Sequence, residues 1–205
     1  MKVRRRPPVY DRLASYYDRA LAPLERSFLA GWREQAFRYV PEGARLLEIG
    51  AGTGLNFTHY KSAVGVEMSV AGDISHRMLL RAKAKSRPGN VRLVCCSAEE
   101  LPFPPDAFEA AVATLLFCSV ESPARAFAEL RRVVRPGGRI VLLEHVRPRG
   151  SFLGPLFDLL SLVTVPLFDD HFNRRTAQDA HAAGLRIERM EARAFGIVRL
   201  IVCRV

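Results

Sequence analysis

The stretch Leu46-Leu47-Glu48-Ile49-Gly50-Ala51-Gly52-Thr53-Gly54 decides the fold, because it places three glycines directly after a short apolar run. Glycine in such a turn lets the backbone approach a ligand closely and leaves the amides of a following helix exposed to it. A strand, a glycine-rich turn and a helix in this order begin the open α/β sheets that bind nucleotides. We therefore expect a buried strand over Arg45–Ile49, a ligand-binding turn after it and a helix from about Gly54.

Short apolar runs alternate with helical segments along the rest of the chain. Further strands are predicted within 63–71, at Val91–Cys95, at Phe108–Thr114 and over 139–144, with a terminal pair near 185–191 and 197–204. Helices are predicted over 75–85, 122–134 and 173–183, and one or two amphipathic helices, broken near Pro23, over 9–39. This alternation predicts parallel βαβ units in an open sheet with helices on both faces.

The chain is basic, and its positive charge is unevenly distributed. Its 205 residues carry a formal charge of +10, and residues 1–40 hold 9 basic against 4 acidic side chains. Such an excess favours polyanions, which include nucleic acid, anionic membranes and phosphorylated substrates. Nucleic acid is not expected, because aromatic and basic residues do not interleave and no recognition module is appended. The basic residues of the leader before an amphipathic helix favour an anionic membrane surface as partner: Lys2, Arg4, Arg5 and Arg6.

Composition predicts one core, organised as a basic leader with N-terminal cap helices over 1–40 and a single domain over 41–205. The four cysteines show neither CxxC spacing nor a histidine at zinc-finger distance, so we expect no metal, no disulfide framework and a reducing, cytoplasmic setting.

No apolar region of a signal peptide follows the leader. The apolar window 151–168 is interrupted by glycine and proline, which favours a lid or a peripheral membrane contact over a transmembrane helix. The residues predict no oligomeric state.

Three further motifs follow the glycine-rich turn in order. They are Asp73-Ile74-Ser75-His76-Arg77-Met78-Leu79, Cys96-Ser97-Ala98-Glu99-Glu100-Leu101-Pro102-Phe103 and Arg131-Arg132-Val133-Val134-Arg135-Pro136-Gly137-Gly138. With Glu48 two residues before the first glycine, this series resembles the class I S-adenosylmethionine-dependent methyltransferases. The resemblance implies a Rossmann-like fold, a mostly parallel seven-stranded sheet with helices on both faces and an antiparallel C-terminal strand. In the last motif, proline stops the helix and the glycines take positive φ.

The resemblance also implies S-adenosyl-L-methionine as cofactor and assigns residues to it. Glu48 approaches the methionine amino group, Asp73 holds the ribose hydroxyls, and Thr114 lies near the methyl group. Glu67 is the alternative ribose acid, and helix capping is the alternative role of Asp73. Ser97, at the position that faces the adenine amino group, replaces the family's usual aspartate. The remaining cofactor residues are the turn, its neighbours and one tyrosine of the N-terminal cap: Gly50, Ala51, Gly52, Gly54, Ile74, Met78, Ala98, Glu99 and Tyr17.

The segments 113–123 and 143–146 are similar to thiol S-methyltransferases and to phospholipid N-methyltransferases, and more loosely to quinone-ring C-methyltransferases. All three groups act on lipophilic acceptors, so the resemblance implies a phospholipid amine, such as phosphatidylethanolamine, or an alkyl thiol. Quinone-ring C-methylation and a non-catalytic, cofactor-binding membrane protein remain alternatives.

Methyl transfer from a sulfonium is an in-line displacement that needs alignment and exclusion of water. A protonated acceptor needs a base as well, and His145, at the end of the strand predicted over 139–144, is our candidate. Bonding within its own loop is the alternative role of His145. In the polar segment 169–176, His171 is a second catalytic candidate and Arg174 could pair an anionic group of the substrate, while Asn173 and the arginines could instead organise the helix start.

Overall fold

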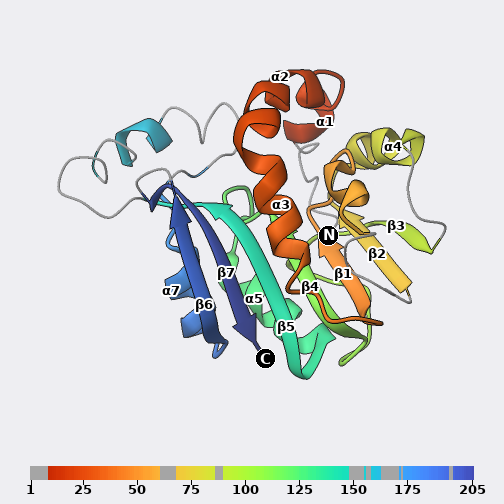
Figure 1. Cartoon of the computed structure of the whole chain (residues 1–205), viewed down its shortest axis with the longest axis vertical. Coiled ribbons are helices and arrows are strands. Elements are labelled where there is room, and N and C mark those ends of the chain that lie inside the picture. The colour runs from red at the N-terminus through yellow and green to blue at the C-terminus, as the bar shows by residue number, and fades with distance from the viewer. Residues whose placement is uncertain are drawn as a thin grey trace, which may run out of the picture.

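The chain forms one seven-stranded sheet with helices on both faces (Figure 1). This computed structural model describes residues 9–60, 68–85, 90–147, 155, 158–162, 171, 173–193 and 196–205. The strand order is β3-β2-β1-β4-β5-β7-β6, and β1 to β5 run parallel to one another. Strand β7 is antiparallel to both β5 and β6. The predicted fold class is confirmed, including the antiparallel C-terminal strand.

The strands are β1 Arg45–Ile49, β2 Met68–Asp73, β3 Val91–Cys95, β4 Phe108–Thr114, β5 Val134–His145, β6 Arg186–Arg193 and β7 Val198–Arg204. The helices are α1 Val9–Leu13, α2 Tyr17–Leu24, α3 Ala30–Phe37, α4 His76–Ala84, α5 Pro123–Val133 and α7 Thr176–Ala182. A π-helical turn, η1 Glu25–Leu29, joins α2 to α3, and the 3₁₀ turn η2 Leu55–Thr58 follows the glycines.

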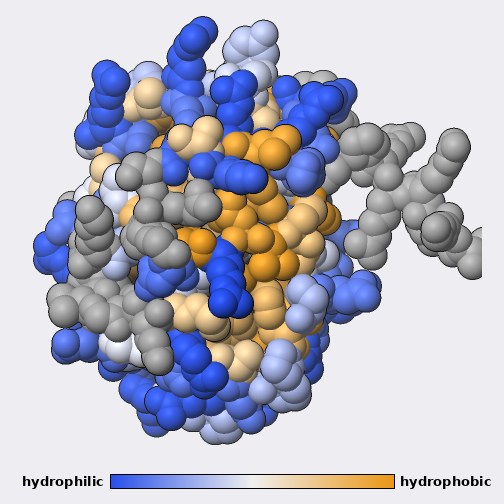
Figure 2. Space-filling view, turned by 90° about the vertical axis from the view of Figure 1, so that its right-hand side faces the viewer, coloured by the Kyte–Doolittle hydropathy of each residue, from blue (hydrophilic) through white to orange (hydrophobic). Residues whose placement is uncertain are grey.

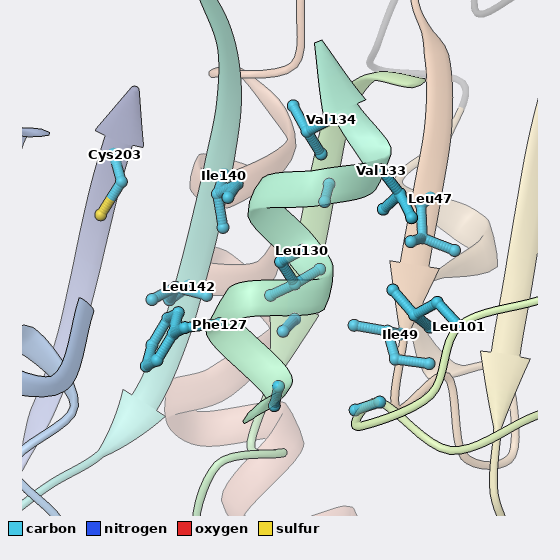
Figure 3. Packing of buried hydrophobic residues seen from close by; sticks show 14 of the residues in the cluster. Leu47, Ile49, Leu101, Phe127, Leu130, Val133, Val134, Ile140, Leu142 and Cys203 are labelled. Carbon is cyan, nitrogen blue, oxygen red and sulfur yellow. The ribbon is translucent and has the colours of Figure 1, made fainter. Parts of the chain in front are cut away.

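Two apolar layers hold the helices against the sheet. On one face, Phe127, Leu130 and Val133 of α5 pack on β1 and β5 (Figure 3), and Ala180 of α7 joins the same cluster. On the other face, α3 contributes Trp32, Ala36 and Phe37, and α4 contributes Ala82. Helix α5 begins as its sequence predicts, since Ser122 accepts a hydrogen bond from the Arg125 amide and Pro123 takes the first turn.

The surface beside α4 and β3 carries an apolar area framed by hydrophilic side chains (Figure 2). The connection between β3 and β4 contains no helix that could cover this end of the sheet. Ile74, in the turn before α4, and Leu80, within α4, are about half exposed. None of the helices in the described ranges is long and apolar enough to cross a membrane.

Several predicted boundaries were wrong. In place of a helix from Gly54, the described residues form the short η2 turn, because Gly54 itself has φ 78 and a left-handed residue does not start an α-helix. Pro23 lies inside α2, one residue before its end, and the irregularity after it is a π-helical turn. Strand β2 extends two residues beyond 63–71. Of the two glycines after Pro136, which were both expected to take positive φ, only Gly137 does so, whereas at Gly138 a Cβ would approach Val134 Cγ1 to 2.5 Å.

Candidate functional site

The loops named by the motifs meet at one edge of the sheet, because the carboxyl ends of parallel strands lie on the same side. The glycine-rich turn follows β1, and Asp73 is the last residue of β2. The segment after β3 begins at Cys96, and Leu115 follows β4. The site is therefore assembled from segments far apart in the sequence.

The glycine-rich turn leaves room beside it for a ligand. Gly50, Gly52 and Gly54 have φ values of 76, 55 and 78, which L side chains rarely adopt. A Cβ on Gly52 would meet no atom within 4 Å, whereas one on Gly50 would meet Leu116 Cδ1 at 2.8 Å. Gly50 therefore packs against the loop after β4, and the open space lies next to Gly52.

Asp73 is fixed by backbone amides. Its Oδ2 accepts from the Gly52 amide and its Oδ1 from the Ser75 amide, both at 2.8 Å. Burial raises the pKa of Asp73, and these two hydrogen bonds oppose the rise. Ser75 in turn caps α4 by accepting from the Met78 amide. The carboxylate keeps further lone pairs for the two hydroxyl donors of a ribose.

Glu48 is fully buried and is held by side chains. Its Oε1 accepts from Asn56 Nδ2 at 2.6 Å, and its Oε2 accepts from the hydroxyl of Tyr60. Burial raises its pKa to about 7, although both hydrogen bonds favour the charged form. Both oxygens thus accept hydrogen bonds from side chains of the chain itself, so Glu48 links the end of β1 to η2.

Arg33 of α3 also belongs to this hydrogen-bond network. Its Nη1 donates to Thr114 Oγ1 at 2.8 Å and to Asn56 Oδ1 at 3.0 Å, while its Nε pairs with Glu25 at 2.8 Å. Asn56 also donates to Thr114 Oγ1 at 3.0 Å. A chain of buried hydrogen bonds therefore connects an N-terminal helix to the ends of β1 and β4.

The helices α1 and α2 lie over these loops and contact three of them. Tyr10 bonds Ser119 after β4 at 2.7 Å, Asp11 accepts from Ser75 Oγ after β2 at 2.5 Å, and Asp18 accepts from Thr53 Oγ1 of the glycine-rich turn at 2.5 Å. Figure 1 shows α1 and α2 at the same end of the molecule as α4. We call α1 and α2 the cap. Lys85 ties the cap to the end of α4 through its ion pair with Asp18 at 2.7 Å.

Tyr17 is the predicted cofactor residue of the cap. Burial raises its pKa to about 12, and Arg33, Cys118, Asp73 and Glu25 are the charged or ionisable groups near it. Its phenol therefore stays neutral near pH 7, and its ring meets that of Tyr10 edge-on at 6.2 Å between centroids.

The residues predicted for the adenine end differ in their contacts and in their burial. Ser97 Oγ accepts from the Glu99 amide at 3.2 Å, and Ala98 is buried. Glu99 Oε1 accepts from the amides of Glu121 and Ser122, so its carboxylate joins this segment to the start of α5. Of the two predicted residues near Asp73, Met78 is a buried residue of α4 and Ile74 is 48% exposed.

The two predicted catalytic histidines lie on different segments. His145 ends β5 and pairs with Val198 in β7. The amide of His171 donates to the Cys118 carbonyl at 2.9 Å, which brings His171 against the loop after β4. Arg174 donates through Nη2 to the Val120 carbonyl at 2.6 Å, so one of its donors is already bound to backbone. Glu67 lies outside the described residues, as do most of the apolar window 151–168 and residues 169, 170 and 172 of the polar segment.

Several site residues were not predicted from the sequence. The cap contacts of Asp11 and Asp18 could have been suspected from the repeated Tyr-Asp of residues 10–18. No motif includes Arg33, Asn56 or Tyr60, because their roles depend on how α3 and η2 pack against the sheet.

Comparisons with known proteins identify the family of this chain. Residues 47–142 match the family of methyltransferase domains. The ubiquinone/menaquinone biosynthesis C-methyltransferase UbiE of Azotobacter vinelandii is 31% identical over 173 residues, 81% of this chain and 68% of that one. The phosphatidylethanolamine N-methyltransferase of Cereibacter sphaeroides is 37% identical over 117 residues, 55% of this chain and 56% of that one.

Solved structures show the same fold. A methyltransferase of Haloferax volcanii, solved in complex with the Trm112 methyltransferase activator, aligns with a TM-score of 0.77 over 98% of this chain and 99% of that one, at 15% identity. The chain belongs to the S-adenosylmethionine-dependent methyltransferases, and S-adenosyl-L-methionine is its cofactor. The open space at Gly52 and the amide-held carboxylate of Asp73 fit that cofactor.

Proposed function

We propose that the protein methylates a small lipophilic acceptor, an amine-bearing phospholipid such as phosphatidylethanolamine or an alkyl thiol. The observation that carries the proposal is the composition of the loop after β4. Directly after Thr114, the last residue of β4, it continues with Leu115, Leu116, Phe117 and Cys118, so the segment next to the expected methyl position is apolar. A relative that shares 37% identity is itself a phosphatidylethanolamine N-methyltransferase.

Leu115 has an unusual backbone conformation at this place. Its φ is 53, in the left-handed region that a bulky side chain rarely adopts, and its amide donates to the Leu143 carbonyl at 2.8 Å. Such outliers persist where the surrounding structure fixes them, and they cluster at functional sites. We infer that this strain helps to shape the acceptor pocket.

The cofactor supplies a methyl group on a sulfonium, and the residues of the chain have to align the acceptor and exclude water. The cap covers the loops at the site edge, while Asp73 and the glycine-rich turn would orient the ribose. Ser97, Ala98 and Glu99 would face the adenine, with Met78 and Ile74 beside the ribose. An ammonium or thiol acceptor must lose a proton, and His145 is the base we propose.

The role of His145 is tested by His145→Ala. We expect turnover to fall about 100-fold, the lower range for removing a general base, with the Kd for S-adenosylhomocysteine unchanged. His181→Ala, on α7, is the matched control. Unchanged turnover in His145→Ala would remove it as base and move the role to His171, which can be tested in the same way.

The acceptor class is tested with labelled S-adenosylmethionine and three panels: phosphatidylethanolamine vesicles, long-chain alkyl thiols, and quinols that lack a ring methyl. Product masses identify the methylated atom. Transfer to the first or second panel supports the proposal. Binding of the cofactor with no transfer to any panel would favour a non-catalytic, cofactor-binding protein.

Quinone-ring C-methylation is the second candidate, favoured by a relative named for ubiquinone and menaquinone biosynthesis that matches 81% of this chain. Transfer to carbon in the third panel alone would establish it in place of the first candidate. In either case the acceptor is lipophilic. Arg174 would bind an acidic group of the acceptor through nitrogens other than the one held by Val120.

We also propose that residues 1–40 form a basic leader and cap over a catalytic domain at 41–205, and that they dock on an anionic membrane. The outer face of the cap supports this, since Tyr16 and Leu24 are 66% and 49% exposed and Arg19 and Arg26 lie exposed nearby in sequence. Aromatic and aliphatic side chains with arginine beside them suit a lipid interface.

Deleting residues 1–8 should weaken binding to phosphatidylglycerol vesicles about tenfold or more at low salt, with cofactor affinity retained. The combined change Tyr16→Ser and Leu24→Ser should weaken binding further at high salt, where charge is screened. Vesicle binding that neither change affects would contradict the proposal.

A further inference from the structure

Arg33 is a buried charge at the methyl end of the site. Its side chain is only 4% exposed, and its ion pair with Glu25, at 2.8 Å, uses only Nε. Nη1 is fully used, since its two hydrogens go to Thr114 and Asn56. Burying a guanidinium is expensive unless its donors are matched, so each remaining donor needs an explanation.

The other terminal nitrogen, Nη2, takes part in no hydrogen bond within the part of the chain that the structure describes. It is also not among the sealed side-chain atoms that have no partner. Nη2 therefore keeps a small accessible surface. Two N–H donors of an otherwise buried guanidinium face space that a ligand can reach.

The position of these donors points to one part of the cofactor. Arg33 lies 2.8 Å from Thr114 Oγ1 and is linked through Asn56 to Glu48, whereas Asp73 and Ser97 belong to the β2 and β3 ends. S-adenosylmethionine carries a sulfonium, an ammonium and a carboxylate at its amino-acid end. A fixed guanidinium would repel the two cations unless the carboxylate lay nearest to it.

We propose that Nη2 of Arg33 binds the carboxylate of the amino-acid part of S-adenosylmethionine. Arginine suits this task, because its planar donors match a carboxylate and it keeps its charge when buried. The same contact would join the cofactor to α3, and through Glu25 to the π-helical turn that leads to the cap.

The test compares ligands with and without the carboxylate on the full-length protein by calorimetry. The probes are S-adenosylhomocysteine, its decarboxylated analogue and 5′-methylthioadenosine, which lacks the whole amino-acid part. We expect Arg33→Met to weaken S-adenosylhomocysteine about 10- to 100-fold, the range for one charge-assisted hydrogen bond, and the other two ligands less than about threefold.

Arg33→Lys keeps the charge without the planar donors and covers the case in which Arg33→Met fails to fold. It should give the same ligand pattern with a smaller loss. Arg45→Met is the matched control, since Arg45 also pairs with a glutamate, Glu109, but lies at the start of β1, away from the site. It should change none of the three affinities.

Equal losses for all three ligands would overturn the proposal and leave Arg33 a purely structural residue. Unchanged affinity for S-adenosylhomocysteine would overturn it as well. A raised KM for an anionic acceptor, measured separately, would then assign the donors to the acceptor. No acceptor is present in the binding experiment, so its result does not depend on whether the acceptor is an amine, a thiol or a quinol.

Discussion

Asp73 and Glu48 lie at the carboxyl ends of neighbouring strands, yet the chain holds their two carboxylates by different means. Asp73 accepts from two backbone amides, one of them only two residues away. Glu48 accepts from Asn56 and Tyr60, and its network continues to Arg33. A carboxylate held by backbone depends on the shape of a turn, whereas one held by side chains depends on the identity of each partner. We therefore expect Asp73 to govern affinity, and Glu48 to govern folding and proton binding as well.

The largest effect is expected for Glu48→Ala. Losing this carboxylate leaves Asn56 and Tyr60 without their buried acceptor, and the free energy of unfolding should fall by about 3–5 kcal/mol, with measurable cofactor binding lost. Urea denaturation measures the change. Glu109→Ala, which removes a partly exposed partner of Arg45, is the control and should cost about 1 kcal/mol or less. Equal stability losses in Glu48→Ala and Asp73→Ala would remove the contrast between the two carboxylates.

Asp73→Ala should mainly weaken cofactor binding. Two hydroxyl bonds to a carboxylate are lost, and we expect a rise of about 100-fold or more in the Kd for S-adenosylhomocysteine. Asp73→Asn keeps one acceptor oxygen and should lie between Asp73→Ala and the unchanged protein. Near-normal affinity in Asp73→Ala would transfer the ribose role to Glu67.

The raised pKa of Glu48, about 7, predicts pH-dependent cofactor binding. The cationic amino-acid end of the cofactor favours the ionised carboxylate, so binding lowers this pKa and releases a proton. Affinity should rise with pH and level off above about 7, being about tenfold lower at pH 6 than on the plateau. Calorimetry in buffers of different ionisation enthalpy measures the released proton. Glu48→Gln should lack the pH dependence, and a dependence that persists there would assign it to another group.

The smallest effect is expected in the cap. Asp11→Ala removes the bonds from Ser75 Oγ and the Arg77 amide, so cofactor affinity should fall about threefold. The pH dependence from Glu48 should be unchanged, because Asp11 acts at the Asp73 end. Arg12→Ala, on the exposed side of α1, is the control. Loss of the pH dependence in Asp11→Ala would show that the two ends are coupled.

The sequence predicts local features well and packing poorly. Strands β1, β3 and β4 begin and end where the apolar runs predict, and Ser122 and Pro123 mark the start of α5. The Asp73 contacts can be predicted from the motifs, since they arise from a turn and a helix start. The Glu48 network is not predictable in this way, because Arg33, Asn56 and Thr114 meet only after α3 packs on the sheet. The sequence alone does not distinguish a helical arginine that is buried from one that is exposed.

The cap contacts have a consequence for how the protein matures on the ribosome. Tyr10 bonds a residue 109 positions later in the chain, and Asp11 bonds one 64 positions later. At translation rates of about 5–20 residues per second, α1 waits roughly 5–20 s before Ser119 has even been synthesised. Helix α1 therefore leaves the exit tunnel well before its partners are made, and a nascent chain that still lacks Ser119 leaves the inner face of this helix exposed to chaperones.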